Sequence, residues 1–255
     1  IASVCGAFGF FIGGMLGELG VHVAIWTQVV TLSLCGVLFF LVCKDDTLSP
    51  INEISTKDLL KDSNPFSAFM QSRQFMTWTL VFLFAMCGLQ SLVQTVHDQS
   101  FNYYAIDQLG FSTGYNGLVK FVMGMATLVA NSTLCVWLMN KTDIRKSIIA
   151  IFSIGAGLMA AIIMIDVLVP FLVVNIVFYS LNAITLPIMQ DMVAENASGQ
   201  QSNLVMGFYN AMKSLGAIIG AFIAGFSYAI LPKMPFICCL AAFVLAIICA
   251  VIYLK

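Results

Sequence analysis

The chain is divided into eight long apolar blocks, and this feature limits its possible folds more than any other. Each block is close to the roughly 20 residues that a helix needs to cross the hydrocarbon core of a bilayer. A segment in that core must pair its own backbone N–H and C=O groups, as a helix does. We therefore predict an all-α polytopic membrane protein. The blocks cover residues 1–19, 23–42, 75–96, 114–139, 147–165, 170–189, 205–230 and 234–254.

The bulk composition agrees with a membrane protein and excludes several functions. Hydrophobic residues make up 60% of the chain and charged residues 9%, whereas a soluble domain carries about 25% charged residues. A net charge of −1 gives no reason to expect a nucleic-acid partner. No cysteine pair has the spacing C-x-x-C, and no nucleophile or metal-ligand motif occurs. We therefore expect no metal, no cofactor and no enzymatic activity.

The basic residues predict which loops face the cytoplasm. Most of the Lys and Arg residues fall on one side if the blocks alternate across the bilayer, and the positive-inside rule places that side in the cytoplasm. We expect an integral, multi-pass protein of the plasma (inner) membrane with a cytoplasmic C-terminus. The basic residues on this side are Lys44, Lys57, Lys61, Arg73, Lys141, Arg145, Lys146 and Lys255. The opposite loops are expected to hold Glu18, Asp98, Asp107, Asp166 and Lys233.

One long polar segment separates two apolar blocks from six. It carries both signs of charge and two prolines, which is typical of a solvated linker. Because the chain begins inside a helix without Met, we expect four earlier helices to precede it. The chain would then comprise the last two helices of an N-terminal six-helix half (1–43), a cytoplasmic linker (44–74) and a C-terminal six-helix half (75–255). Two such halves are typical of secondary transporters.

Glycines lie on one helical face of the first block, at Gly6, Gly9, Gly13 and Gly17, with Gly14 beside them. Such a face lets two helices approach closely in lipid. Simple helix packing accounts for the pattern, and so does a glycine surface along which two moving halves of the protein slide. The two interpretations are compatible.

A polar stripe follows one face of the block 114–139, with Lys120 near its outer end. The stripe includes Asn116, Thr127 and Asn131, at steps of three or four residues. A lysine at the centre of a spanning helix costs about 3 kcal/mol on insertion scales, so we expect this face to line water or a solute cavity. The alternative is that Lys120 snorkels to the interface, although Asn131 lies too deep to do so.

Two weaker polar stripes, on the third and sixth blocks, suggest the same cavity. Their members are Gln90, Gln94, His97, Asp98, Asn175, Tyr179 and Asn182. Each stripe alone is equally compatible with hydrogen bonds between helices. A second intramembrane cation, Lys213 in the seventh block, either pairs with Asp191, reaches the cytoplasmic surface or faces the cavity.

Two short motifs carry a family resemblance. Segment 9–14 has the sequence G-F-F-I-G-G, and loop 140–145 has the sequence N-K-T-D-I-R. They resemble the G-P-x-x-G-G motif of the fifth helix and the D-R-x-G-R-R loop after the eighth helix in the major facilitator superfamily, specifically its drug:proton antiporter-like branch. In the loop, Lys141 and Arg145 match in charge, whereas Asp143 replaces a glycine. The resemblance implies that this loop ties helix ends together on the cytoplasmic side.

A third similarity extends the resemblance towards the C-terminus. The glycines Gly207, Gly216, Gly220 and Gly225 are similar to the G…G-x-x-x-G pattern of the family's eleventh helix. The order of these motifs implies that the chain runs from the fifth to the twelfth helix of a twelve-helix major facilitator fold, with Gly216 and Gly220 in a second close helix contact.

The resemblance implies a secondary active transporter of small solutes that works by alternating access. The sequence has no phosphate-cradling G-x-x-x-x-G-K-[ST] loop, so we expect a proton or other coupling ion, or the solute's own gradient, to supply the energy. Proton-coupled efflux of drug-like compounds is the first expectation. A nutrient or sugar symporter or uniporter of the same fold is the alternative, and a non-transporting membrane scaffold or sensor is the alternative of another class. We expect a monomer in the lipid bilayer.

Overall fold

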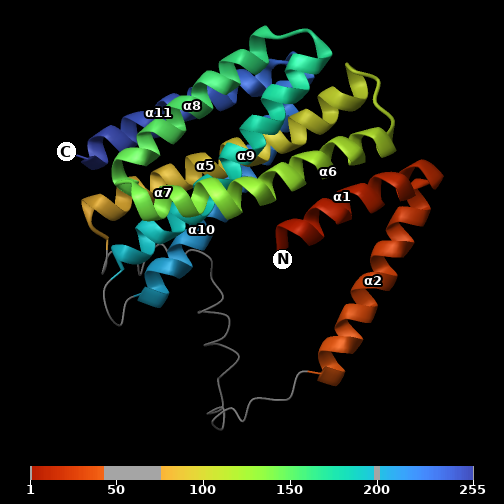
Figure 1. Cartoon of the computed structure of the whole chain (residues 1–255), viewed down its shortest axis with the longest axis horizontal. Coiled ribbons are helices and arrows are strands. Elements are labelled where there is room, and N and C mark those ends of the chain that lie inside the picture. Colours follow the sequence, from red (N-terminus) through yellow and green to blue (C-terminus); the bar gives the residue numbers. More distant parts are fainter. Residues whose placement is uncertain (1, 43–75, 198–201, 255) are drawn as a thin grey trace.

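The computed structural model describes residues 2–42, 76–197 and 202–254, and every regular element within these ranges is a helix (Figure 1). Among these elements, seven spans are long and apolar enough to cross a bilayer, and the first helix is a shorter apolar one. The predicted all-α polytopic membrane fold is therefore confirmed. The predicted linker 44–74 lies outside the described residues.

The helices follow the eight predicted blocks in order. The span Thr113–Lys141 is continuous but contains a π-helical turn, η2, between α6 and α7. The elements are α1 (Ala2–Leu19), α2 (Val21–Val42), α5 (Trp78–Asp107), α6 (Thr113–Ala130), η2 (Asn131–Cys135), α7 (Val136–Lys141), α8 (Ile144–Met164), α9 (Leu168–Glu195), α10 (Ser202–Ile230) and α11 (Met234–Leu254).

Two helices are longer than the sequence pattern predicts. Helix α5 continues to Asp107 rather than ending near 96, and α9 continues to Glu195 rather than ending near 189. The prediction that Asp98 lies in an outer loop is therefore wrong, because this residue lies within α5. An apolar block ends where polar side chains begin, but a helix inside a bundle continues when those side chains find partners on neighbouring helices.

The turn between α5 and α6 sets the register of the polar stripe. Gly110 in this turn has a φ of 66°, a conformation that glycine adopts without steric cost. Ser112 then caps α6, and its hydroxyl accepts a hydrogen bond from the Tyr115 N–H at 3.1 Å. Together they reverse the chain within a few residues, so that α6 runs back past α5.

Helix α5 is the central helix of the segment that follows the linker. It packs against α10 and α11, while α8 packs against α11 and α9. The contact with α10 is close: a Cβ on Gly216 would meet the backbone of Gly88, and one on Gly220 would lie 2.8 Å from the Leu92 carbonyl oxygen. Gly216 and Gly220 thus allow α10 to approach α5 backbone to backbone.

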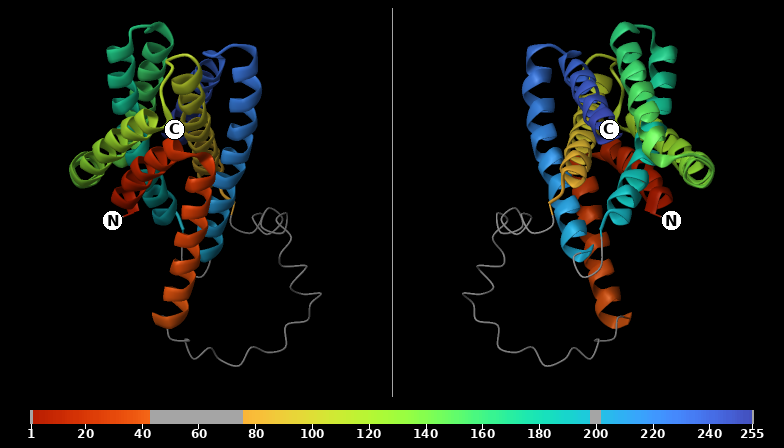
Figure 2. Two further views of the ribbon diagram at one scale, coloured as in Figure 1. Left: turned by 90° about the vertical axis from the view of Figure 1, so that its right-hand side faces the viewer. Right: turned by 90° about the vertical axis from the view of Figure 1, so that its left-hand side faces the viewer.

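Helix α1 lies alongside α6, as Figures 1 and 2 show from three directions. A Cβ on Gly14 would lie 2.8 Å from the Gly117 Cα, and a Cβ on Gly124 would lie 2.6 Å from the Ala7 Cβ. These distances are shorter than real Cβ contacts, so the glycines are needed for the two backbones to approach. Helix α2 projects away from the other helices (Figure 1), and none of its residues is buried.

The close contact on α1 involves only part of the predicted glycine face. A Cβ on Gly17 would lie 3.4 Å from the Thr113 Cβ, which is an ordinary van der Waals contact. A Cβ on Gly6, Gly9 or Gly13 would meet no atom within 4 Å in the described part of the chain. The face that packs against α6 is therefore rotated from the predicted one, because Gly14 rather than Gly13 points at the neighbouring helix.

Candidate functional site

A small polar cavity lies between α5, the α6–η2 junction and α9. Its volume is about 210 Å³. Five of its seven lining residues belong to the predicted polar stripes, so three separate helices do bring these stripes together. The lining residues are Gln94, Thr127, Asn131, Tyr179, Asn182, Ala183 and Leu186.

Two polar atoms of the cavity wall have no partner. The Thr127 hydroxyl oxygen and Asn131 Oδ1 are buried and form no hydrogen bond with any other residue that the structure describes. Most buried polar atoms in native proteins are hydrogen-bonded, because leaving one unpaired costs about 1–3 kcal/mol. Neither atom is reached by water in the described structure, so both are unsatisfied polar groups beside the cavity.

Asn131 lies where the π-helical turn begins. Asn131 is the first residue of η2, and a π-turn rotates the following side chains relative to a regular helix. The hydroxyls after it bond to their own helix: Ser132 donates to the Leu128 carbonyl at 2.8 Å and Thr133 to the Val129 carbonyl at 2.6 Å. Of the polar residues in this turn, Asn131 is the one that lines the cavity.

Lys120 forms an ion pair inside the bundle. Its ammonium group bonds to Asp98 Oδ1 on α5, and its side chain is 3% exposed, compared with 37% for Asp98. The ring of Phe101 on α5, the ring of Phe10 on α1 and the ring of Tyr179 on α9 each lie 5.4 to 5.7 Å from the ammonium nitrogen. Lys120 therefore points into the helix bundle rather than snorkelling to the interface, because a buried charge is stabilised by a counter-ion and by aromatic faces.

Tyr179 connects this ion pair with the cavity. Tyr179 lines the cavity, and its hydroxyl donates a hydrogen bond to Asp98 Oδ1 at 2.8 Å. The same carboxylate oxygen thus accepts from both Tyr179 and Lys120. The neighbouring stripe residue Gln94 lies one turn before Asp98 on α5 and also lines the cavity.

The other predicted cavity residues lie outside it and join helices. Asn116 Nδ2 donates to Asn102 Oδ1 at 3.1 Å, and His97 Nε2 donates to Asn175 Oδ1 at 2.9 Å. Gln90 behaves differently, since its Nε2 bonds to Asn182 Oδ1, a cavity residue, while its own Oε1 has no partner among the described residues. These bonds join α6 to α5 and α9 to α5, and they hold the cavity walls together.

Lys213 does not reach the cavity. Its ammonium nitrogen lies 5.5 Å from the centre of the Tyr209 ring on the same helix, and it forms no ion pair within the described ranges. Its backbone carbonyl accepts a hydrogen bond from the Ser91 hydroxyl at 2.7 Å. None of the three predicted environments of this lysine is therefore established by a contact.

The loop 140–145 forms a tight turn between α7 and α8. Asp143 caps α8 by accepting a hydrogen bond from the Arg145 N–H at 3.2 Å, and its carboxylate lies 3.7 Å from the Lys146 ammonium nitrogen. Lys141 ends α7 and is exposed. These are local contacts, and they serve to start α8.

Sequence reasoning missed the partners of two charged residues. Asp98 was noted on the Gln94 face, but its pairing with Lys120 was not foreseen. Glu18 at the end of α1 accepts hydrogen bonds from the Ser112 hydroxyl at 2.6 Å and the Gly114 N–H at 3.2 Å, at the start of α6. The available signal was the helix-start pattern around Ser112, since a helix N-terminus attracts a carboxylate.

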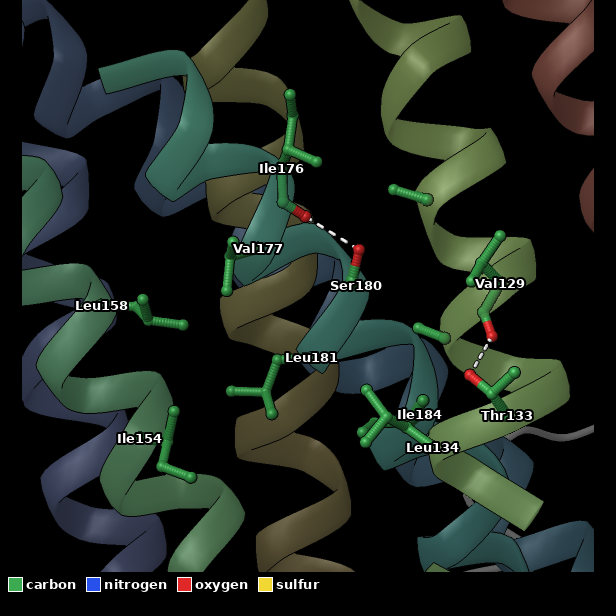
Figure 3. Close-up of a pocket in the computed structure, with 12 residues that line it drawn as sticks. Val129, Thr133, Leu134, Ile154, Leu158, Ile176, Val177, Ser180, Leu181 and Ile184 are labelled. Atoms are coloured by element: carbon green, nitrogen blue, oxygen red, sulfur yellow. Dashed lines mark hydrogen bonds between the residues drawn. The ribbon is translucent and has the colours of Figure 1, made fainter. Parts of the chain in front are cut away.

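A second, apolar groove lies between α6, η2, α8 and α9. Figure 3 shows α9 as its floor, with Ile154 and Leu158 of α8 on one side and Thr133 and Leu134 of η2 on the other. Its volume is about 490 Å³. The hydroxyls at its edge bond to their own helices, so the groove offers apolar surface only.

A comparison with protein families resolves the class of this chain. The family model of the Major Facilitator Superfamily matches residues 1–183, which include six of the seven residues that line the cavity. The chain belongs to the Major Facilitator Superfamily. As a member of this superfamily it is a multi-pass membrane protein and a secondary transporter of small solutes. A comparison with curated proteins gives no match.

Proposed function

We propose that this major facilitator protein transports a small, neutral, polar solute, which binds in the cavity between α5, α6 and α9. The observation that carries the proposal is the chemistry of the wall. Residues with amide and hydroxyl side chains from three helices line the cavity, and two of their oxygen atoms, on Thr127 and Asn131, are buried without a partner in the described chain. Groups of this kind bind hydroxyl-rich solutes such as sugars, because each can donate or accept.

The charges beside the cavity favour a neutral solute. Lys120 and Asp98 neutralise one another, so the site presents no free charge to attract an ionic compound. A cationic drug would need an unpaired carboxylate, and an anionic one an unpaired ammonium group. Of the two transport functions that the sequence suggests, the nutrient or sugar transporter therefore fits the cavity better.

Efflux of drug-like compounds is the second candidate, and the apolar groove favours it. Its wall is apolar and its volume, about 490 Å³, is large enough for such a molecule. The groove opens on the outer surface of α8 and α9, where Ile154 and Val177 are about half exposed. In this candidate, an amphipathic compound would enter from the bilayer.

We further propose a coupling ion, an oligomeric state, a membrane orientation and a division into two moving halves. A proton is the coupling ion, and the protein is a monomer in the plasma membrane with a cytoplasmic C-terminus. The segments 1–43 and 75–255 belong to two halves that move against one another, with 44–74 as their cytoplasmic linker. The contact of α1 with α6 through Gly14 and Gly117 supports the seam between these halves, because smooth backbone surfaces can slide.

Counterflow in proteoliposomes tests the choice of solute. The full-length protein is reconstituted, the vesicles are loaded in turn with unlabelled glucose, xylose or glycerol, and uptake of the same labelled compound is followed. Ethidium serves as the cationic drug-like probe in parallel. We expect transient accumulation of at least one sugar or polyol and none of ethidium. Ethidium exchange without exchange of any neutral compound would instead favour the drug-efflux candidate.

A further inference from the structure

A third pocket opens between the C-terminal ends of α5 and α10, and its volume is about 430 Å³. A Cβ on Gly225 would meet no atom within 4 Å in the described chain, so the space between the two helices is open here. None of the lining residues belongs to the wall of the polar cavity. The lining residues are Tyr103, Ile106, Asp107, Gly225, Tyr228 and Ala229.

Two tyrosine rings, one from each helix, line this pocket. The ring centres of Tyr103 and Tyr228 lie 5.5 Å apart, and the ring planes are inclined at 51°. Tyr103 is 46% exposed, and Tyr228 is partly buried. Rings that are not stacked in parallel leave part of their π faces available. Such a face attracts a cation that lies within about 6 Å of the ring centre.

Asp107 supplies a carboxylate beside the two rings. Its Oδ2 accepts a hydrogen bond from the Tyr228 hydroxyl at 3.0 Å and one from the Gln108 side-chain amide at 2.7 Å. Both donors are neutral, and Oδ1 accepts no hydrogen bond from the described residues. Asp107 also forms no ion pair within the described ranges. Its carboxylate is therefore held in place without a cation to balance it.

The position of Asp107 at a helix end adds to the negative potential. It is the last residue of α5, and neither α5 nor α10 has a basic residue in its last turn. The free carbonyl groups at the C-terminal end of a helix favour a cation and disfavour a carboxylate. Lys233, which follows α10, is bound to Asp166 instead. The pocket thus combines a carboxylate, two helix ends and two aromatic rings, and each of these attracts positive charge.

We propose that this pocket binds a quaternary ammonium group, of the kind carried by free choline or by a phosphatidylcholine headgroup. The methyl groups lie against Tyr103 and Tyr228, with the nitrogen beside Asp107. A quaternary ammonium ion donates no hydrogen bond and is recognised by aromatic faces and a nearby negative charge. This suits Asp107, because its Oδ2 already accepts two hydrogen bonds. The inference does not depend on which solute the polar cavity binds.

Thermal unfolding of the full-length protein in maltoside detergent tests the proposal, because a ligand that binds the native state raises the unfolding midpoint. Midpoints are measured in tetramethylammonium, methylammonium and sodium chloride at equal ionic strength, so that general salt effects can be subtracted. We expect a saturable rise of a few degrees with tetramethylammonium relative to sodium. Methylammonium, which has the same charge but fewer methyl groups, should give a smaller rise.

The variants assign the rise to the pocket. Asp107→Asn keeps the size of an exposed side chain and should abolish the rise. Tyr103→Leu should also abolish it, whereas Tyr103→Phe keeps the ring and should retain it. Asp166→Asn is the matched control, because it removes an exposed acid that is already paired with Lys233. This control should respond to tetramethylammonium as the wild type does.

Nanodiscs distinguish the two sources of the quaternary ammonium group. If the ligand is a free cation, tetramethylammonium should raise the wild-type midpoint in phosphatidylcholine and in phosphatidylglycerol discs alike. If it is a lipid headgroup, tetramethylammonium should act only in phosphatidylglycerol discs. In phosphatidylcholine discs the wild type should then unfold at a higher temperature than Asp107→Asn without any added cation. Either pattern supports the site and identifies its source.

Four results would overturn the proposal. Equal wild-type midpoints in tetramethylammonium and sodium would show that no quaternary ammonium group binds, and an undiminished rise in Asp107→Asn would place the binding elsewhere. A rise with methylammonium as large as with tetramethylammonium would mean that charge alone is recognised. Loss of the rise in Tyr103→Phe would exclude recognition by the ring. No sugar is present in these measurements, so their failure is distinct from a failure of the counterflow experiment.

Discussion

At the scale of single residues, the polar side chains of the bundle divide into those that have partners and those that do not. Hydrogen bonds between amide and imidazole side chains join α5 to α6 and to α9. Six buried side-chain atoms lack a partner within the described structure: Thr127 and Asn131 contribute two of them and line the polar cavity, whereas Gln90, His97, Ser100 and Asn116 contribute the other four and do not. In lipid such atoms find no water from outside, so leaving them unpaired is costly.

The sequence predicts which residues face the cavity better than it predicts their partners. Steps of three and four residues place Thr127 and Asn131 on one helical face, and the structure brings this face to Tyr179 of α9. The pairing of Lys120 with Asp98 depends instead on how α5 and α6 rotate against each other after the turn at Gly110. Periodicity within one helix carries no information on that rotation.

Lys120→Met should destabilise the protein, because it leaves the Asp98 carboxylate without its counter-ion beside a buried methionine. The water-accessible position of Asp98 reduces the cost, so we expect a fall in the thermal unfolding midpoint of a few degrees rather than loss of folding. Adding Asp98→Asn should restore most of the midpoint. Thermal unfolding of the purified protein in detergent measures both. Equal midpoints for wild type and Lys120→Met would contradict the ion pair.

At the scale of helices, the sequence predicts their existence and order but not all their ends. A block of about 20 apolar residues has the length of one membrane-spanning helix. The bounds of α11 therefore match the prediction at both ends. Helix α5 exceeds its block because His97, Asp98 and Asn102 are polar and yet lie inside the bundle, where each has a partner. Hydropathy alone treats such residues as loop.

The contact of α1 with α6 combines close backbone packing at glycines with hydrogen bonds to one carboxylate. Gly14 and Gly117 bring the backbones together, and Glu18 accepts hydrogen bonds from Ser112 and Gly114 at the start of α6. A Cβ on Gly114 would collide with the Glu18 carboxylate. The glycine therefore admits the acid to the helix N-terminus, where the backbone N–H groups and the dipole favour it.

Adjacent glycines on α1 provide a matched test of this contact. Gly14→Ala should lower the thermal unfolding midpoint, because its Cβ would lie 2.8 Å from the Gly117 Cα and 2.9 Å from the Thr113 carbonyl oxygen. Gly13→Ala should leave the midpoint unchanged or raise it slightly, since alanine favours a helix and no atom lies within 4 Å of its Cβ in the described chain. The reverse order of the two midpoints would mean that α1 presents its other face to α6.

At the scale of the whole molecule, the distribution of basic residues predicts the orientation in the membrane. Single cysteines in a full-length, cysteine-free background test it in intact cells with an impermeant thiol reagent. Asp107→Cys, at the exposed end of α5, should be labelled, whereas Lys141→Cys, at the exposed end of α7, should be protected until the membrane is permeabilised. Labelling of Lys141→Cys but not of Asp107→Cys would invert the topology.

The arrangement of helices around the cavity could not be predicted from this single sequence. Three polar stripes on separate blocks suggest one site, and five of the seven residues that line the cavity come from these stripes. The stripe residues Gln90, Asn116, Lys120 and Asn175 lie outside the cavity lining, as does Lys213 of the seventh block. In lipid, helix neighbours are chosen by small residues and hydrogen bonds that several helices offer equally well. Only the packed structure distinguishes a residue that lines the cavity from one that joins its walls.

Counterflow of the best-exchanged sugar or polyol by the variant Asn131→Leu tests the central claim, that the polar cavity between α5, α6 and α9 binds the solute. Asn140→Leu, an exposed asparagine at the end of the same span, is the matched control. Removing a hydrogen-bonding group from the site should raise the half-saturation concentration for exchange by about tenfold, which corresponds to about 1.4 kcal/mol of binding free energy. Membrane abundance should be unchanged, and Asn140→Leu should keep the wild-type half-saturation concentration. Wild-type exchange by Asn131→Leu would contradict the account.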